Sequence, residues 1–292
     1  MASIAGSSYV NFSGVSDPTQ TNLSYSNYLA RWMLTVAAST KLTNLPPSMF
    51  PSISGLSQSW NPASLFTEQN PTNAKKIAYI FGDSTAQRVP YLLTRNLDRH
   101  SWKIEMRSFP GCDLASVKTV GSKGIECRKL QSNFFGEIKK HPADLVLVTE
   151  QNGWFFNSSN QPPRSRGTVI GLKNNLSIIA AHTKRLIFLG SLPTATSLID
   201  CIRGEKQIPP SCFANQNNFK FINTLESRLV TSAGGTYVNA ASWFCSNSIC
   251  PPIIAGTPVM IDGQHLTDAM SQKLSVLFGY WLWAQPWARD LL

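Results

Sequence analysis

Two short polar blocks in this chain of 292 residues carry the side chains needed for nucleophilic chemistry. Residues 82–84 read Gly-Asp-Ser directly after an apolar run, and residues 262–265 read Asp-Gly-Gln-His before the last helical segment. A serine hydroxyl is a weak nucleophile until a histidine takes its proton, and an aspartate can orient that histidine through its other ring nitrogen. The sequence therefore offers Ser84 as a nucleophile, His265 as its base and Asp262 as the group that orients the base.

Each block also has a structural interpretation when taken alone. Serine is a preferred N-cap residue, so Ser84 could equally serve to begin the helix that follows it. An aspartate three residues before a histidine on a turn is as often structural as catalytic. The other histidines are weaker candidates because His141 and His182 fall near helix ends and His100 follows one, where a histidine usually caps carbonyls or is solvated.

The elements that must position these blocks alternate along the chain from Lys75 onward. Five short apolar runs rich in β-branched or aromatic residues predict buried strands, at 77–81, 104–106, 145–149, 186–189 and 236–238. Segments with helical patterns lie between or after them, at 85–97, 130–140, 168–182, 217–232 and 267–287. This order predicts an α/β fold whose parallel sheet is covered on both faces. Ser84 then lies at the carboxyl end of a strand, where open parallel sheets place functional side chains.

The N-terminal region over 1–70 differs from the rest of the chain. It carries only four charged residues, Asp17, Arg31, Lys41 and Glu68, and one helical stretch near residues 27–38. We expect an irregular, partly helical extension over 1–70 that packs on a main domain over 71–292.

Composition and cysteine usage point outside the cytosol. Charged residues make up 14% of the chain. This share is well below the roughly 25% of typical soluble chains, so much of the surface must be uncharged and polar. The net charge of +10 is scattered in pairs with no basic arm, which argues against nucleic acid as a partner. No pair of cysteines has the CxxC spacing of a zinc or redox site, and we expect no metal or other cofactor.

Six cysteines fall into three couples that are close in the sequence. We predict disulfides that pair in sequence order, Cys112 with Cys127, Cys201 with Cys212 and Cys245 with Cys250. No segment has the length of a membrane helix, and the N-terminus lacks the pattern of a signal peptide. An exported protein with disulfides would then be the extracytoplasmic part of a longer, membrane-tethered polypeptide, or would have lost its signal.

Taken together, the two polar blocks resemble those of the SGNH (GDSL-like) hydrolase superfamily over roughly residues 75–285. In that superfamily the nucleophile lies in a GDS block after the first strand, and the acid and base lie in a DxxH block near the C-terminus. The short cysteine loop 245–250 followed by Asp-Gly-Gln-His-Leu-Thr at 262–267 is most similar to SGNH domains fused to acyltransferase-three membrane domains, which carry an ordered extension ahead of the SGNH domain. The resemblance implies a three-layer α/β/α, flavodoxin-like fold with a mostly parallel five-stranded sheet.

The resemblance also implies an oxyanion hole. Gly111, after the second predicted strand, matches the glycine whose backbone N–H serves there, and Asn152, after the third, matches the asparagine side chain. The third block departs from the family pattern, because Glu150 stands in place of a glycine and Gly153 in place of an aspartate. Asn152 could therefore also simply cap a turn. We interpret Asp83 as structural and Glu150 as a pocket residue without an assigned role.

The function implied is serine-dependent acyl transfer through a covalent acyl-enzyme. The resemblance favours an acetyl group, a carbohydrate or other extracytoplasmic acceptor and an upstream membrane domain that supplies the acyl unit. Water as the acceptor would make the protein an esterase, and a sugar hydroxyl would make it an O-acyltransferase. A non-catalytic glycan- or lipid-binding domain is the main alternative. A plant-type polysaccharide esterase fits less well, because in that family the histidine is typically followed by tryptophan rather than by Leu266.

Overall fold

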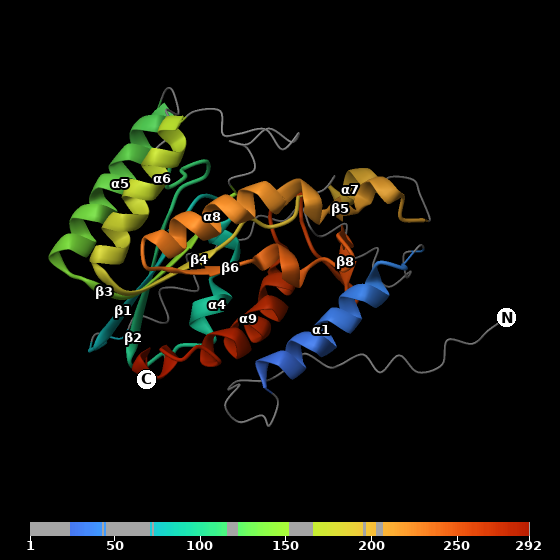
Figure 1. Ribbon diagram of the computed structural model, residues 1–292, viewed down its shortest axis with the longest axis horizontal. Helices are drawn as coiled ribbons and strands as arrows, with labels where there is room; N and C mark the ends of the chain where they lie inside the picture. The colour runs from blue at the N-terminus through green and yellow to red at the C-terminus, as the bar shows by residue number, and fades with distance from the viewer. Residues whose placement is uncertain are drawn as a thin grey trace.

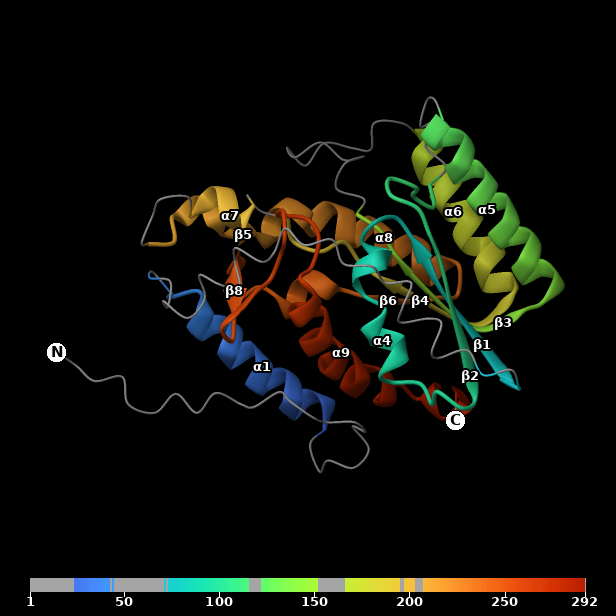
Figure 2. The same ribbon diagram turned by 180° about the vertical axis from the view of Figure 1, so that it is seen from behind.

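The computed structural model describes residues 24–42, 44, 71, 73–115, 122–151, 166–194, 197–202 and 207–291. A central sheet runs through the molecule with helices against both of its faces (Figure 1). The same arrangement is seen from behind in Figure 2, where α1 and α9 again lie side by side.

Five parallel strands form the sheet, in the order β2-β1-β3-β4-β6. Their bounds are Lys76–Gly82 (β1), Trp102–Ser108 (β2), Ala143–Thr149 (β3), Thr183–Leu189 (β4) and Thr236–Val238 (β6). The three central strands are almost wholly apolar and buried in their second halves, as strands covered on both faces must be. The predicted α/β fold and all five predicted strands are confirmed.

Two helical layers cover the sheet. The first consists of α5 (Ser122–Lys140), α6 (Arg166–Ala181) and α8 (Lys220–Ser232), and its core includes Phe81 and Phe134, whose rings stack at 4.5 Å. The second consists of the short α4 (Tyr91–Thr94) and the apolar α9 (Asp268–Trp283), which pack against the opposite face. None of the described helices is long and apolar enough to cross a membrane.

The described part of the N-terminal region is α1 (Tyr25–Ser39), which packs along α9. Tyr28 stacks on Tyr280 with ring centroids 4.2 Å apart, and the fully buried Trp32 donates its ring N–H to the carbonyl of Trp243 at 2.5 Å. The expected boundary at residue 70 falls outside the described residues and remains a prediction.

Two predicted helices differ from the structure. The expected helix over 85–97 is broken into a 3-10 turn, η4 (Ala86–Arg88), and α4, because Pro90 has no N–H for a helical hydrogen bond and disfavours a helical Val89 before it. The helix predicted from residue 130 begins at Ser122, so that Cys127 lies within it.

Short elements connect the C-terminal half. They are α7 (Leu198–Cys201), η6 (Pro210–Cys212), β5 (Ala214–Asn215), η7 (Gln216–Phe219), η8 (Ala240–Trp243), β7 (Ile249–Cys250), β8 (Ile253–Ile254), β9 (Thr257–Pro258) and η9 (Ala288–Leu291). The three disulfides pair as predicted, Cys112–Cys127, Cys201–Cys212 and Cys245–Cys250.

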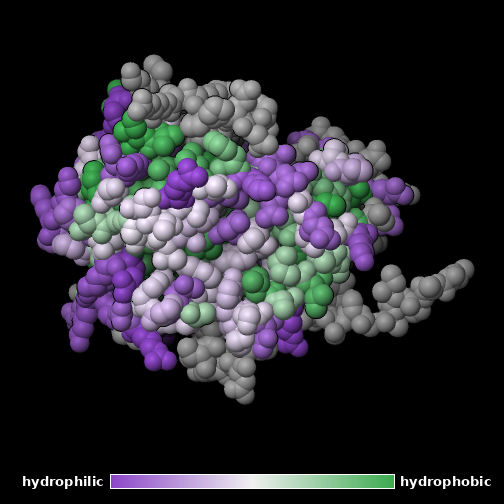
Figure 3. All heavy atoms as spheres, viewed as in Figure 1, coloured by the Kyte–Doolittle hydropathy of each residue, from purple (hydrophilic) through white to green (hydrophobic). Residues whose placement is uncertain are grey.

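Charge is unevenly distributed between the edge of the sheet at which the strands begin and the edge at which they end. Hydrophilic side chains gather over the end of the molecule where β1, β2 and β3 begin (Figure 3). Exposed lysines belong to this edge, namely Lys75 before β1, Lys139 and Lys140 at the end of α5 and Lys184 in β4. These four lysines therefore lie opposite the edge at which the strands end and the polar blocks lie.

Candidate active site

The Gly-Asp-Ser block begins at the last residue of β1. Gly82 has a φ of +153°, and a Cβ at this position would lie 1.8 Å from the carbonyl oxygen of Thr149 in β3. A side chain would force the two central strands apart. Glycine is thus required here so that the chain can turn from the strand toward Ser84.

Asp83 is buried and bonded to backbone on both sides. Its Oδ1 accepts from the N–H of Thr85 at 2.7 Å, and its Oδ2 accepts from the N–H of Gln151 at 3.0 Å. Burial raises the pKa of the Asp83 carboxyl, while the hydrogen bonds from Gln151 and Thr85 oppose that rise. The side chain joins the ends of β1 and β3, which agrees with the structural role predicted for it.

The Asp-Gly-Gln-His block is a turn that holds itself together. Asp262 Oδ1 accepts from the N–H groups of Gln264 at 3.1 Å and His265 at 3.0 Å. Gly263 takes a φ of +85°, a conformation that favours glycine. The N–H of Ile261 donates to the carbonyl of His265 at 2.7 Å, which closes the turn. The position of the His265 ring is therefore set by contacts within five residues.

The structure brings the two blocks together. Nε2 of His265 lies 2.7 Å from Oγ of Ser84, and Nδ1 lies 2.7 Å from Oδ2 of Asp262. Burial alone would raise the pKa of the Asp262 carboxyl, but its hydrogen bonds with His265 lower it overall, so that it is a carboxylate at neutral pH. This arrangement can pass a proton from the serine hydroxyl to an imidazole that is oriented from its far side.

Ser84 does not cap the following helix. The residue before η4 is Thr85, and no side chain makes a cap hydrogen bond there. The hydroxyl of Ser84 lies instead against His265.

Arg88 is a residue near the site that sequence reasoning missed. Burial lowers the pKa of its guanidinium, and the negative charges of Asp262 and Asp268 oppose that shift. A positive charge close to Asp262 favours the ionised carboxylate. In the sequence, only the position of Arg88 four residues after Ser84 indicated that it lies near the site.

The loop after β2 lies beside the serine block. Ser108 is in register with Gly82, and the N–H of Phe109 donates to the carbonyl of Gly82 at 3.3 Å. Gly111 follows two residues later, exposed and with a φ of +74°. The structure thus places Gly111 in the loop next to the serine, where its N–H lies outside the sheet.

Four side chains from other elements hold this loop. Glu150 is fully buried, and its Oε2 accepts from the N–H of Leu114 at 2.5 Å. Gln131 donates to the carbonyl of Asp113 at 2.5 Å, and Asn175 donates to that of Leu114 at 2.6 Å. The disulfide from Cys112 to Cys127 in α5 is the fourth contact.

Glu150, for which the sequence assigned no role, is fully buried and fixes the loop of Gly111 from inside the molecule. Asn152, the second predicted oxyanion donor, lies outside the described residues. Its neighbour Gln151 is bonded to Asp83. Among the described residues, no group of three or more His, Cys, Asp or Glu side chains could hold a metal ion.

Comparison with known families identifies one match over most of the chain. Residues 54–279 match the family described as the SGNH domain fused to AT3 domains. None of the curated protein sequences compared with the chain matches it significantly.

Solved structures with a similar fold include three enzyme structures. The periplasmic domain of a lipopolysaccharide acetyltransferase from Salmonella ser. Paratyphi A is 19% identical, with a TM-score of 0.59 over 89% of this chain and 97% of that one. An acetylxylan esterase from Geobacillus stearothermophilus is 10% identical, with a TM-score of 0.44 over 70% and 93% of the two chains. An aryl esterase from M. smegmatis is 15% identical, with a TM-score of 0.43 over 74% and 100%.

Proposed function

The chain belongs to the family of SGNH domains fused to AT3 domains, which places it among enzymes that transfer acyl groups or hydrolyse esters, and from this premise we propose that it transfers an acetyl group to or from a hydroxyl of an extracytoplasmic carbohydrate. In this proposal Ser84 is the nucleophile, His265 the general base and Asp262 the residue that orients the base. Gly111 and Asn152 supply the oxyanion hole.

One observation carries the proposal. The hydroxyl of Ser84 lies 2.7 Å from Nε2 of His265, whose Nδ1 lies 2.7 Å from Asp262. A hydroxyl at this distance from a neutral imidazole nitrogen can lose its proton as it attacks, and this proton transfer is what a serine needs in order to react with an ester.

In the first half-reaction, Oγ of Ser84 attacks the carbonyl carbon of an acetyl ester and His265 accepts the hydroxyl proton. The negative charge that develops on the carbonyl oxygen is stabilised by the backbone N–H of Gly111 and the side chain of Asn152. The tetrahedral intermediate collapses as its bond to the donor oxygen breaks, and His265 returns the proton to that leaving group. Ser84 is left acetylated.

In the second half-reaction, a hydroxyl group of the acceptor gives its proton to His265 and attacks the acetylated serine. Collapse of the second intermediate breaks the bond to Ser84, whose oxygen recovers the proton from His265. The negative charge of Asp262 stabilises the imidazolium in both halves. A sugar hydroxyl in this step gives O-acetyl transfer, and water gives ester hydrolysis.

The family and the fold support the proposed acceptor and donor. The domain shares its fold with the periplasmic domain of a lipopolysaccharide acetyltransferase, which favours acetyl as the acyl group and a carbohydrate as the acceptor. The fusion of this family to AT3 domains favours a membrane acyltransferase domain, upstream in the polypeptide, that supplies the acyl unit and tethers the domain. Disulfides agree with an extracytoplasmic location.

A fluorophosphonate probe tests the proposal directly. We expect the probe to label Ser84, as located by peptide mass spectrometry, and the Ser84→Ala variant to remain unlabelled at the same melting temperature. Acetyl release from 4-nitrophenyl acetate by the wild-type domain should be blocked by the probe. A folded domain that is neither labelled nor active would instead be a binding domain that keeps the fold without the chemistry.

A further inference from the structure

A polar hollow of about 510 Å³ lies between the first half of α8 and the end of β6. Three asparagines line it, Asn217 from η7, Asn223 from α8 and Asn239 after β6. The rest of the lining consists of Gln216 of η7, Lys220, Thr224 and Ser227 of α8, and Tyr237 of β6. The proposed chemistry at Ser84 makes no use of this hollow.

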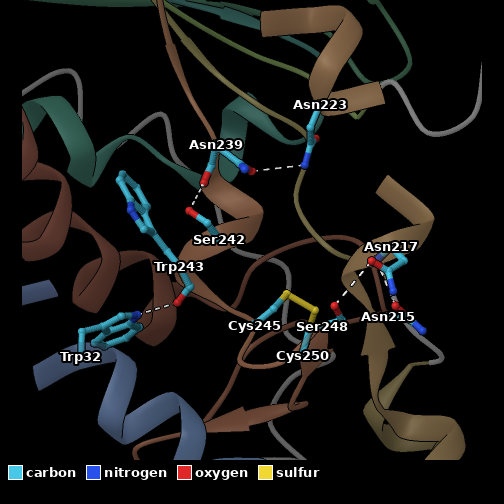
Figure 4. Close-up of a disulfide and its surroundings, with 10 residues drawn as sticks. All are labelled: Trp32, Asn215, Asn217, Asn223, Asn239, Ser242, Trp243, Cys245, Ser248 and Cys250. Atoms are coloured by element: carbon cyan, nitrogen blue, oxygen red, sulfur yellow. Dashed lines mark hydrogen bonds between the residues drawn. A yellow bond between two sulfur atoms is a disulfide. The ribbon is translucent and has the colours of Figure 1, made fainter. Parts of the chain in front are cut away.

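Asn223 is a buried polar side chain in the lining of the hollow. Only 7% of the residue is exposed, and its Nδ2 donates to Oδ1 of Asn239 at 3.2 Å (Figure 4). Its Oδ1 is a buried acceptor that has no hydrogen-bond partner among the described residues. Leaving such an acceptor unsatisfied costs about 1–3 kcal/mol, and a small rotation of this amide toward the hollow would let a ligand hydroxyl satisfy it.

The lining matches one class of ligand. Amides and hydroxyl groups both donate and accept hydrogen bonds, as the hydroxyl groups of a sugar do. Uncharged amides and hydroxyls with one lysine offer no carboxylate for a metal ion. A sugar carries hydroxyl groups that pair with such amides and hydroxyls and an apolar ring face that packs on the rest of the lining.

The hollow lies at the same edge of the sheet as Ser84. Tyr237 and Asn239 lie at the end of β6, and β6 is three strands from β1 in the order β1-β3-β4-β6. Neighbouring strands are about 4.8 Å apart, so the two positions are separated by about 14 Å across the sheet. A single sugar ring cannot span that distance, whereas an oligosaccharide can.

The short cysteine loop fixes one wall of the hollow. Cys245 and Cys250 are bonded, and within this loop the carbonyl of Ser248 accepts from the N–H of Gln216 at 2.9 Å. The hydroxyl of Ser248 also donates to Oδ1 of Asn217 at 3.4 Å (Figure 4). The loop thus holds η7, which lines the hollow, in place before any ligand arrives.

We propose that this hollow is a binding subsite for a sugar unit of the carbohydrate whose hydroxyl or acetyl ester reacts at Ser84. The inference rests on the function proposed for Ser84, and it adds that the acceptor is a glycan chain held about three strands away from the reacting group. The cysteine loop contributes to glycan binding through the position of η7.

Binding to an array of immobilised bacterial polysaccharides tests the subsite without need of turnover. Thr224 is exposed on the rim, and Thr224→Trp would fill the hollow from its open side. Ser232→Trp is the matched control, because Ser232 is also exposed on α8 and also donates its hydroxyl to the carbonyl four residues earlier, but lies outside the hollow. We expect Thr224→Trp to weaken binding to the polysaccharides at least tenfold and Ser232→Trp to leave it unchanged.

Asn239→Ala is a second variant in case the tryptophan disturbs folding, and melting temperatures report on folding for all samples. Equal binding by the wild type and by folded Thr224→Trp and Asn239→Ala would overturn the subsite. So would a folded wild-type domain that binds no polysaccharide on the array. Hydrolysis of 4-nitrophenyl acetate in the same samples reports on Ser84 separately, so failure of the proposed chemistry is distinguished from failure of the subsite.

Discussion

Ser84 and His265 lie 2.7 Å apart, but the two regions that supply them are held in different ways. The serine region is part of the sheet. It depends on Gly82 against Thr149, on the buried Asp83 and on a loop that Glu150 fixes from the interior. The histidine region is a turn in which the Asp262 side chain is exposed and the hydrogen bonds that shape the turn lie within residues 261–265.

The difference shows which part of the site must be built by the fold and which part can be built locally. In the proposed mechanism the nucleophile needs an oxyanion hole whose groups follow two different strands, and the sheet brings the ends of those strands together. A base needs one orienting partner, which the turn supplies by itself. Outside the contact between Ser84 and His265, the difference also ranks the expected effects of mutations, because changes to the buried region should damage more than changes to the turn.

The largest effect should come from the contact that joins the two regions. We expect Ser84→Ala and His265→Ala each to lower kcat for 4-nitrophenyl acetate about ten-thousandfold, and the double variant to be scarcely worse, because neither residue acts without the other. Steady-state kinetics of the four proteins would measure this. If the two single losses multiply, the residues are not partners and the base lies elsewhere.

Asn152→Ala should have the next largest effect. If Asn152 donates to the oxyanion, kcat should fall about a hundredfold while the melting temperature is unchanged, as expected when one such donor is lost. A loss below about threefold would mean that Asn152 only caps a turn and does not donate to the oxyanion.

Asp262→Asn tests the exposed region. The Asp262 side chain is 54% exposed. Solvent therefore screens its charge, and the turn can still partly orient the ring. We expect kcat to fall less than for His265→Ala, and less than the roughly ten-thousandfold loss that replacing a buried triad aspartate causes. A ten-thousandfold loss would mean that the exposed carboxylate is as important as a buried one, and the contrast between the regions would not hold.

The glycine of each region allows a matched test of stability. Gly82→Ala places a methyl group 1.8 Å from a backbone carbonyl inside the sheet. This clash should cost about 3 kcal/mol or prevent folding. Gly263→Ala adds the strain of a left-handed alanine on a turn outside the sheet, which costs about 1 kcal/mol. Urea denaturation of both variants measures the difference, and equal costs would contradict it.

The smallest effect is a difference in pH dependence. The pKa of Asp262 is lowered in the folded protein, so its stabilisation is present above the unfolded value of about 3.8 and is lost as the pH falls through the folded pKa. The pKa of Asp83 is raised, so the folded protein is penalised as the pH rises from about 3.8 through the folded value.

Unfolding free energies of the wild type, Asp262→Asn and Asp83→Asn at pH 3 and pH 7 test these opposite signs. Asp262→Asn should lose more stability at pH 7 than at pH 3, by less than about 1 kcal/mol because the charge is exposed and screened. Asp83→Asn should lose less at pH 7 than at pH 3. If the stability lost by both variants changes in the same direction between pH 3 and pH 7, the assignment of one carboxylate as buried and the other as exposed is refuted.

The sequence predicted the sheet well because buried parallel strands are continuous apolar runs, and that pattern is local. Ser84 and His265 are 181 residues apart in the chain. The rule that active sites lie at the carboxyl ends of strands was enough to place Ser84 at this edge of the sheet. The pairing of Ser84 with His265 was predicted from the chemistry of the two blocks and their resemblance to the SGNH pattern, whereas the 2.7 Å geometry depends on how the chain folds between them.

Contacts between distant polar residues were beyond sequence reasoning. Glu150 departs from the family pattern, which favours a pocket residue, but its partner is the N–H of Leu114 in the preceding loop. Asn175 begins an Asn-Leu-Ser glycosylation sequon, yet its side-chain amide donates a hydrogen bond to the carbonyl of Leu114. Neither partner is marked by residue type, because both are backbone groups. Pro90, by contrast, was a visible signal for the break between η4 and α4.

The layout of the disulfides has a consequence for biosynthesis. The bonded cysteines are 15, 11 and 5 residues apart, and no closed loop contains a cysteine of another pair. A chain that enters an oxidising compartment from its N-terminal side exposes both members of each pair before the next pair arrives. Oxidation in order of arrival then gives the native connectivity, one of 15 that six cysteines allow. Maturation of this domain should therefore require an oxidase but little help from a disulfide isomerase.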